Sequence, residues 1–172
     1  MKNEAKPVRL ILSDVDGVLT DGGVVYDNEG VEHKKFHVRD GLGIKLWQDA
    51  GHTFGILTAR NSHIVQVRAA ELGIGIVCQG FADKLSKARE IIAEVGVDPS
   101  EVCFIGDDLP DLPVIREVGL GVAVADAASD VRESANYVTK CRGGEGAVRE
   151  VIEMILRAQM RWEDIIRPYT DT

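Results

Sequence analysis

The sequence predicts an α/β fold in which a Rossmann-like parallel sheet carries helices on both faces. Short apolar segments alternate with longer stretches of helical periodicity along the chain, which is typical of this class. The apolar segments lack the polar alternation of half-exposed strands, and this indicates strands that are buried on both sides. A chain of 172 residues is long enough for one such domain with its own core.

The expected strands recur along most of the chain. They lie at residues 8–12, 54–57, 74–77, 102–105 and 122–124, with a short last strand at 137–138. Apolar residues at a spacing of about 3.6 predict helices over residues 85–95 and 148–156. In a parallel sheet of this kind, ligands bind at the carboxyl ends of the strands. The residues that follow each strand are therefore the candidates for function.

One connection interrupts this alternation. Residues 21–40 show no helical pattern, and two short apolar runs flank a D-N-E-G turn at residues 27–30, which predicts a β-hairpin over residues 22–38. We expect this hairpin to project beside the site because it follows the first strand directly. We place residues 1–160 in a single domain without a cap, and we expect residues 161–172, which contain Pro168, to form a tail that hangs off the domain or docks on a neighbour.

The composition argues against two kinds of partner. A formal net charge of -8 does not suit a nucleic-acid-binding protein, because phosphate backbones recruit basic surfaces. No window reaches the roughly 18 apolar residues that a membrane span needs. The first residues lack the apolar stretch of a secretory signal. We therefore expect a cytoplasmic protein whose partner is a small molecule.

Carboxylates gather after two of the predicted strands. Asp14 and Asp16 follow the first strand, and Asp107, Asp108 and Asp111 follow the strand at 102–105. Two carboxylates at positions i and i+2 of a continuing strand would share a face and repel each other. A divalent cation would relieve this repulsion, and Mg²⁺ prefers oxygen ligands. Taken alone, the first pair is accounted for equally well by a capped turn with solvated side chains.

Two further polar residues fall near strand ends. Thr58 closes the second predicted strand, and Lys84 begins the helix that follows the third. Neither is unusual by itself, since threonine often caps a helix and a lone lysine is normally solvated. Because the carboxyl ends of parallel strands meet in one crevice, we expect these residues to converge with the carboxylates.

The four motifs together resemble the haloacid dehalogenase superfamily of phosphatases. They are D-x-D-G-x-L-T-D-G, a threonine at a strand end, a lysine and G-D-D-x-x-D, in that order between residues 14 and 111. The resemblance implies that Asp14 attacks phosphorus and forms an aspartyl-phosphate. It implies that Asp16 protonates the leaving alcohol and later deprotonates water. Thr58 and Lys84 would bind the phosphoryl oxygens.

The same resemblance implies a magnesium site. Its ligands would be the carboxylates of Asp14 and Asp107 and the backbone carbonyl of Asp16. Asp111 would orient the phosphate-binding lysine, and Asp108 would support the metal shell. Phosphoryl transfer needs this kind of positioning and charge neutralisation.

Three further segments, at residues 36–44, 79–80 and 143–150, resemble the 3-deoxy-D-manno-octulosonate 8-phosphate phosphatase subfamily. This resemblance implies a capless enzyme of lipopolysaccharide biosynthesis. It also implies a homotetramer in which the hairpins form a central barrel and neighbouring subunits roof the active sites. One departure is Ala59, which stands where the subfamily usually has glycine, and it would matter if that backbone required a positive φ.

Three arginines are candidates for binding the carboxylate of a sugar acid: Arg60, Arg68 and Arg39. Arg60 favours the eight-carbon acid, since relatives that prefer the nine-carbon acid tend to have glutamate there. Two alternatives stay open: a phosphatase for a nine-carbon 9-phosphate, and a non-catalytic oligomerisation module.

Overall fold

The computed structural model describes residues 2–170 and contains a six-stranded parallel sheet and a separate two-stranded hairpin. The strand order in the main sheet is β5-β4-β1-β6-β7-β8. Its strands are β1 (Leu10–Ser13), β4 (Thr53–Thr58), β5 (Ile76–Gln79), β6 (Val102–Gly106), β7 (Leu120–Ala123) and β8 (Tyr137–Val138). The predicted α/β class and the six strands are confirmed.

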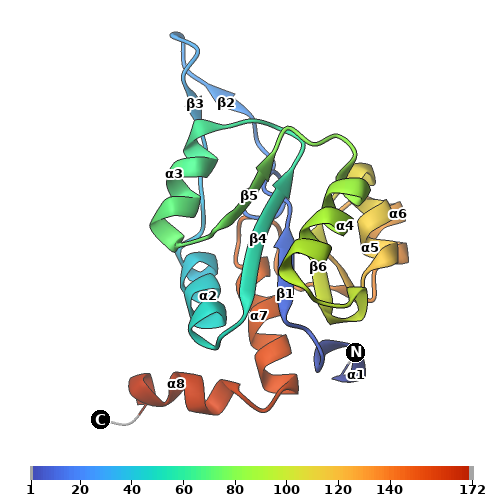
Figure 1. Cartoon of the computed structure of the whole chain (residues 1–172). Coiled ribbons are helices and arrows are strands. Elements are labelled where there is room, and N and C mark those ends of the chain that lie inside the picture. Colours follow the sequence, from blue (N-terminus) through green and yellow to red (C-terminus); the bar gives the residue numbers. More distant parts are fainter. Residues whose placement is uncertain (1, 171–172) are drawn as a thin grey trace.

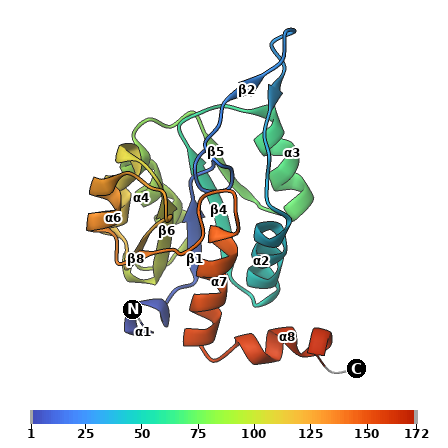
Figure 2. The ribbon, with the colours of Figure 1, turned by 180° about the vertical axis from the view of Figure 1, so that it is seen from behind.

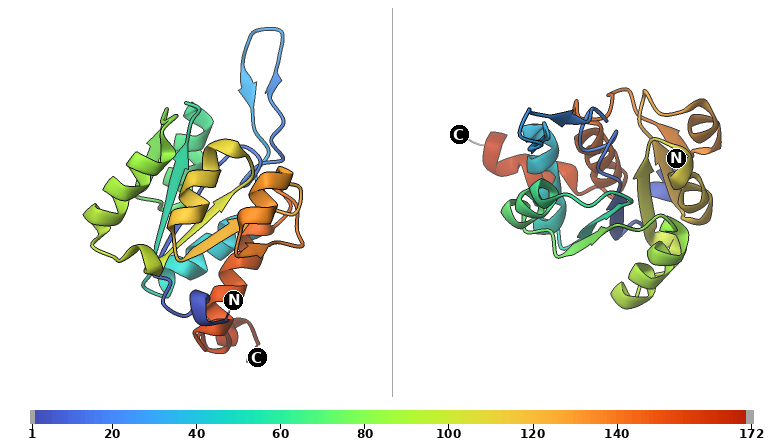
Figure 3. Two further views of the ribbon diagram at one scale, coloured as in Figure 1. Left: turned by 90° about the vertical axis from the view of Figure 1, so that its right-hand side faces the viewer. Right: turned by 90° about the horizontal axis from the view of Figure 1, so that it is seen from above.

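Helices cover both faces of this sheet (Figures 1 and 3). The helices are α1 (Lys2–Ala5), α2 (Val38–Asp49), α3 (His63–Leu72), α4 (Lys84–Val95), α5 (Leu112–Glu117), α6 (Ser129–Ser134), α7 (Ala147–Ala158) and α8 (Trp162–Thr170), with short 3-10 turns at Pro99–Glu101 and Leu109–Asp111. Right-handed crossovers place α2 and α3 on one face and α4 to α6 on the other. Helix α7 returns to the first face and packs against α2.

The first strand lies at the centre of the core. Every residue of β1 is buried, and β1 pairs with β4 on one side and β6 on the other. Strand β5 begins at Ile76, two residues later than we predicted. The reason is local: Gly73 ends α3 in the left-handed conformation, and the N–H of Ile74 still donates to the carbonyl of Ala69.

The predicted hairpin is present, although its paired part is short. Strands β2 (Val25–Tyr26) and β3 (Glu32–His33) are antiparallel, and Asp27 closes the turn by accepting hydrogen bonds from the N–H groups of Glu29 and Val31. The hairpin projects from the edge at which the sheet strands end (Figures 1 and 2). No cap domain is inserted anywhere between residues 2 and 170.

The C-terminal segment is helical over most of its length, which we did not predict. Helix α8 packs on α7 through Trp162, which is 4% exposed and whose ring is contacted by the guanidinium groups of Arg149 and Arg157 on α7. This helix lies at the edge of the sheet opposite the hairpin (Figure 2). Residues 171–172 of the expected tail fall outside the described part of the chain. Within residues 2–170, none of the helices has the length and apolar character needed to cross a bilayer.

Candidate active site

Asp14 stands one residue beyond β1, where the sheet opens. Its backbone N–H still donates to the carbonyl of Ile105 on β6, so the strand fixes the position of its side chain. One carboxylate oxygen accepts the N–H of Val15 at 2.7 Å, and the other lies 2.7 Å from the Nζ of Lys84. Asp14 is 8% exposed. Burial and the nearby carboxylate of Asp111 together raise the pKa of Asp14, although Lys84 opposes the shift.

Lys84 joins two motifs that are distant in the sequence. Its ammonium group pairs with Asp14 and, at 2.6 Å, with the Oδ1 of Asp111. Burial disfavours the charged lysine, but the two carboxylates outweigh this effect and raise the pKa of Lys84. The other oxygen of Asp111 accepts the N–H of Asp107 at 2.9 Å. Both oxygens of Asp111 are thus used to hold other residues of the site in place.

A group of carboxylates marks a place for a cation. Oxygen atoms of Asp14, Asp107 and Asp111 lie within 4.8 Å of one another. Burial and the repulsion from Asp111 and Asp14 raise the pKa of Asp107 to about 7. A divalent ion would offset this repulsion, and hard carboxylate oxygens suit Mg²⁺. The donor set therefore fits magnesium, for which Asp14 and Asp107 would be the side-chain ligands, because Asp111 is engaged by Lys84.

Glycines allow two loops to pack tightly around this place. Gly17 has a φ of +88°, and a Cβ atom there would lie 2.0 Å from a carboxylate oxygen of Asp107. A Cβ atom at Gly143 would lie 1.8 Å from the carbonyl oxygen of Gly17. The N–H of Gly144 donates to the carbonyl of Val18 at 2.9 Å. The glycine-rich segment before α7 therefore supports the loop that carries the two aspartates.

Asp16 lies in a second network, which includes residues of the hairpin. The ammonium of Lys34 contacts its Oδ1, and the Nε of Arg60 lies 3.7 Å from its Oδ2. Glu32 bridges the two cations, at 3.4 Å from Lys34 and 2.9 Å from Arg60. Glu32 and Lys34 were not predicted from the sequence, because single charges on an exposed hairpin resemble ordinary solvated residues.

The remaining predicted residues at the strand ends fall close by. Thr58 ends β4 and is 3% exposed. Asp108 caps the turn Leu109–Asp111 by accepting the N–H of Leu109, and it thereby shapes the turn that presents Asp111. Ala59 is not strained, since Met160 is the one non-glycine residue with a positive φ in the described chain. The substitution of alanine for the usual glycine is therefore accommodated.

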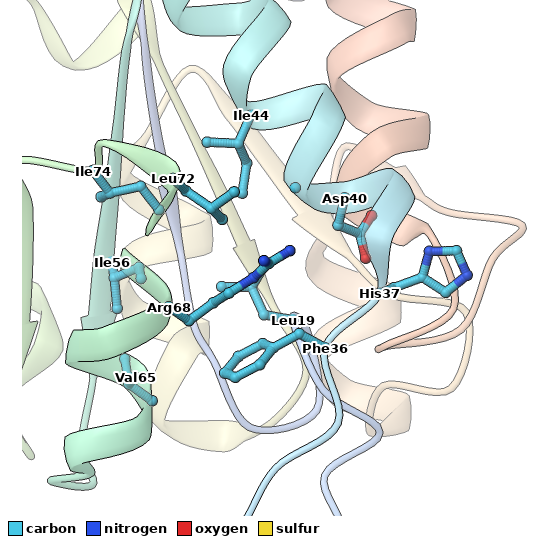
Figure 4. Close-up of a pocket in the computed structure, with 11 residues that line it drawn as sticks. Leu19, Phe36, His37, Asp40, Ile44, Ile56, Val65, Arg68, Leu72 and Ile74 are labelled. Carbon is cyan, nitrogen blue, oxygen red and sulfur yellow. The ribbon is translucent and has the colours of Figure 1, made fainter. Parts of the chain in front are cut away.

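Arg68 and Arg39 lie in other hollows of the single chain. Arg68 reaches from α3 toward α2, beside Phe36 and Gly41, in a small pocket that Asp40 also lines (Figure 4). Its Nη1 atom pairs with Glu71 at 2.7 Å.

The hollow at Arg39 lies between α2 and the start of α7, and Arg149 also lines it. In this single chain, the two arginines do not join the network of Asp16 and Arg60 that the structure describes.

Comparison with known proteins agrees with this arrangement. A model of haloacid dehalogenase-like hydrolases matches residues 76–152. The chain is 45% identical over 159 residues to the 3-deoxy-D-manno-octulosonate 8-phosphate phosphatase KdsC of Yersinia pestis. The aligned region covers 92% of this chain and 85% of that protein. This chain belongs to the 3-deoxy-D-manno-octulosonate 8-phosphate phosphatase family.

Solved structures of this phosphatase family share the whole fold. The Moraxella catarrhalis enzyme, crystallised with magnesium, phosphate and the sugar acid KDO, superimposes with a TM-score of 0.96 at 42% identity and covers 98% of this chain and 97% of that one. A probable YrbI family phosphatase from Pseudomonas syringae gives 0.97 at 46% identity, covering 99% and 97%. The family is capless, and magnesium is its cofactor, in accord with the carboxylate group described above.

Proposed function

We propose that this protein hydrolyses 3-deoxy-D-manno-octulosonate 8-phosphate to the free sugar acid and inorganic phosphate. The observation that carries the proposal is the linkage of Asp14, Lys84 and Asp111 beside Asp107 at the carboxyl edge of the sheet. This arrangement supplies an oriented nucleophile, a buried cation for the phosphoryl group and carboxylates for a metal. The relatives from Yersinia pestis and Moraxella catarrhalis carry the same activity in their names.

The proposed reaction has two steps, formation and then hydrolysis of an aspartyl-phosphate. A carboxylate oxygen of Asp14 forms a bond to phosphorus while the bond to the sugar oxygen breaks, and Asp16 gives its proton to that oxygen. Water then attacks phosphorus, its proton passes to Asp16, and the bond to Asp14 breaks to release phosphate. Bound magnesium reduces the repulsion between the anionic nucleophile and the anionic ester. Lys84 and Thr58 hold the phosphoryl oxygens during both steps.

We propose that three arginines, Arg60, Arg68 and Arg39, determine which sugar phosphate the enzyme prefers. Arg60 lies beside Asp16, where the leaving sugar would lie, and 37% of its side chain is exposed. Its guanidinium could bind the sugar carboxylate through two hydrogen bonds. We propose that Arg68 and Arg39 contribute from a neighbouring subunit, because both lie outside the network of Asp16 within one chain.

We further propose that the protein acts as a cytoplasmic homotetramer in lipopolysaccharide biosynthesis. The hairpin supports this assembly, since Val24, Val25, Tyr26 and Val31 are all more than half exposed. Apolar side chains in a projecting hairpin favour burial against other copies. Assembly of this kind would also close a site that has no cap over it.

A substrate panel tests the function. Purified protein with magnesium would be offered the eight-carbon 8-phosphate, a nine-carbon sugar acid 9-phosphate, glucose 6-phosphate and 4-nitrophenyl phosphate, and phosphate release would be measured. We expect kcat/KM to be highest for the eight-carbon acid. A higher value for the nine-carbon acid would overturn the substrate assignment, and failure to hydrolyse any ester would support a non-catalytic module.

A further inference from the structure

Lys34 occupies an unusual position for a lysine in a projecting hairpin. Its side chain is 2% exposed, whereas the side chain of the next residue, Lys35, is 73% exposed. We propose that Lys34 is a positioning residue for the reaction, which holds the carboxylate of Asp16 where it can reach the leaving oxygen. The hairpin would then position a residue of its own active site in addition to joining the subunits of the proposed tetramer.

The burial of this ammonium group requires compensation. Removing a charged lysine from water is unfavourable unless hydrogen-bonding anions replace the lost solvent. Lys34 has two such anions, Asp16 at its Oδ1 and Glu32 at 3.4 Å. Glu32 is itself fixed by the hydroxyl of Ser62, which donates to its Oε2 at 2.6 Å, and by Arg60. Residues from three separate segments of the chain thus keep Lys34 in this place.

The geometry at Asp16 gives Lys34 the larger role of the two cations. Lys34 is in direct hydrogen-bond contact with Oδ1, whereas the Nε of Arg60 is 3.7 Å from Oδ2, beyond hydrogen-bond range. A carboxylate one residue before a glycine with positive φ lies on a loop, not on a strand. The orientation of the Asp16 carboxylate therefore depends on the side chains that contact it, and Lys34 is the closest of these.

The inference rests on the proposed function, in which Asp16 donates a proton to the leaving oxygen. A proton donor must lie within about 2.6–3.2 Å of its target, and a small displacement sharply lowers the rate. A sugar alkoxide leaves poorly without that proton, whereas a nitrophenolate leaves readily. Loss of Lys34 should therefore selectively slow formation of the aspartyl-phosphate from the sugar phosphate. The ratio kcat/KM reports this first step apart from the second, in which Asp16 takes a proton from water whichever ester was the substrate. A lysine that only stabilised the fold would affect both esters alike.

The test compares kcat and KM of the full-length wild-type protein and Lys34→Met on the eight-carbon 8-phosphate and on 4-nitrophenyl phosphate. We expect kcat/KM on the sugar phosphate to fall by about 30-fold, a fraction of a general-acid contribution. We expect kcat/KM on the aryl ester to fall less than about threefold, because its leaving group needs little acid assistance. Lys34→Arg should restore part of the lost turnover, and Glu32→Gln should give an intermediate loss.

Two controls distinguish the positioning of Asp16 from a purely structural role of Lys34. Lys35→Met removes the adjacent, exposed lysine and should retain wild-type rates on both esters. In an Asp16→Asn background, Lys34→Met should have little further effect on the sugar phosphate, because the residue it positions is already absent. Equal losses of kcat/KM on both esters, or full additivity with Asp16→Asn, would overturn the role of Lys34.

The outcomes for Lys34 and for the enzyme can be told apart. Should the wild-type protein hydrolyse neither ester, the proposed function itself fails. Should Lys34→Met not fold, as judged by circular dichroism, Lys34→Arg and Glu32→Gln decide the matter by the same ratio of rates. An unchanged ratio in both folded variants contradicts the inference.

Discussion

At the scale of single residues, the site depends on how Lys84 is shared between Asp14 and Asp111. The lysine is 2% exposed and lies within 2.7 Å of both carboxylates. Because Asp111 stays paired with the lysine, the nucleophile can exchange its contact with Lys84 for contact with a phosphoryl group. A substitution of Asp111 would remove the residue that holds Lys84, whereas a substitution of Asp14 would remove the nucleophile itself. Asp14 is therefore the residue whose substitution tests the chemistry.

Asp14→Asn should abolish turnover while the protein stays folded. The amide is nearly isosteric but cannot form the aspartyl-phosphate, and we expect a loss of at least about a thousandfold. Burial already raises the pKa of Asp14, so the ionised carboxylate is unfavourable in the fold, and its removal should not lower the melting temperature without magnesium. Phosphate release and thermal unfolding measure the two effects. Residual turnover near the wild-type rate would contradict covalent catalysis.

The carboxylate group makes magnesium binding depend on pH. Asp107 has a folded-state pKa of about 7, above its ordinary 3.8, so the folded chain binds its proton more tightly than the unfolded chain. The free energy of unfolding without metal should therefore fall as pH rises from about 4 to about 7. Magnesium needs the ionised form, so its stabilising effect should grow over the upper part of this range.

Thermal unfolding with excess magnesium or with a chelator, at pH about 5.5 and about 8, tests this dependence. We expect a larger magnesium-induced rise in melting temperature at the higher pH, and chelation should abolish turnover. Asp107→Asn is the matched control and should remove most of the magnesium effect at both pH values. An equal rise at both pH values in the wild-type protein would contradict the role of Asp107 as a metal ligand that must first lose its proton.

Arg60→Ala should weaken the preference for the sugar acid. A charged hydrogen bond lost to the substrate carboxylate corresponds to about 1.5–3 kcal/mol in kcat/KM. Hydrolysis of a small aryl phosphate, which has no carboxylate and needs little acid assistance, should be nearly unchanged. Steady-state kinetics on both esters provide the measurement. An equal loss on both would assign Arg60 to the phosphoryl group or to the fold instead.

Most site residues could be predicted because they directly follow strands. Asp14, Thr58 and Asp107 each stand at the end of a buried parallel strand, and strand order then brings them together. Lys34 had no such signal, since only the three-dimensional course of the hairpin turns it inward. Helix α8 was missed because Pro168 argues against a helix. Its apolar residues in fact recur at helical spacing, at Trp162, Ile165, Ile166 and Tyr169. The buried tryptophan docks the helix.

At the scale of elements, helix α8 contributes to stability without touching the chemistry. Trp162 is buried against α7, and the helix lies at the edge of the sheet opposite the site (Figure 1). Trp162→Ala should lower the free energy of unfolding by about 3 kcal/mol, at the lower end for a buried tryptophan. Turnover at a temperature where the variant is folded should stay near the wild-type rate.

Chemical denaturation and phosphate release provide the two measurements for this helix. Tyr169→Ala, on the same helix, is a suitable control because its side chain is 66% exposed and its truncation should change stability little. A variant at Trp162 that unfolds like the wild type would show that α8 is not docked in solution.

At the scale of the whole molecule, the hairpin is the surface most suited to assembly. Val25→Asp places a charge among the exposed apolar residues of the hairpin, where burial against other copies would be unfavourable. We expect light scattering to give a tetramer for the wild type and smaller species for the variant, with reduced turnover of the sugar phosphate. Tyr169→Asp, at the opposite edge, should remain tetrameric. A wild-type protein that is monomeric and fully active would contradict the assembly.

The packing of Gly143 and Gly144 on the loop at residues 17–21 bears on how the protein is made. The ribosome synthesises the nucleophile early and the segment that supports it late. While the chain is still growing, β1 at first lacks both neighbouring strands and still lacks β6 after β4 has been made, and the aspartates remain on an unsupported loop. Phosphatase activity should consequently be absent from translation products that stop before residue 143, whichever motifs they already contain. Activity in a cell-free synthesis reaction would thus report only chains that extend beyond this glycine segment.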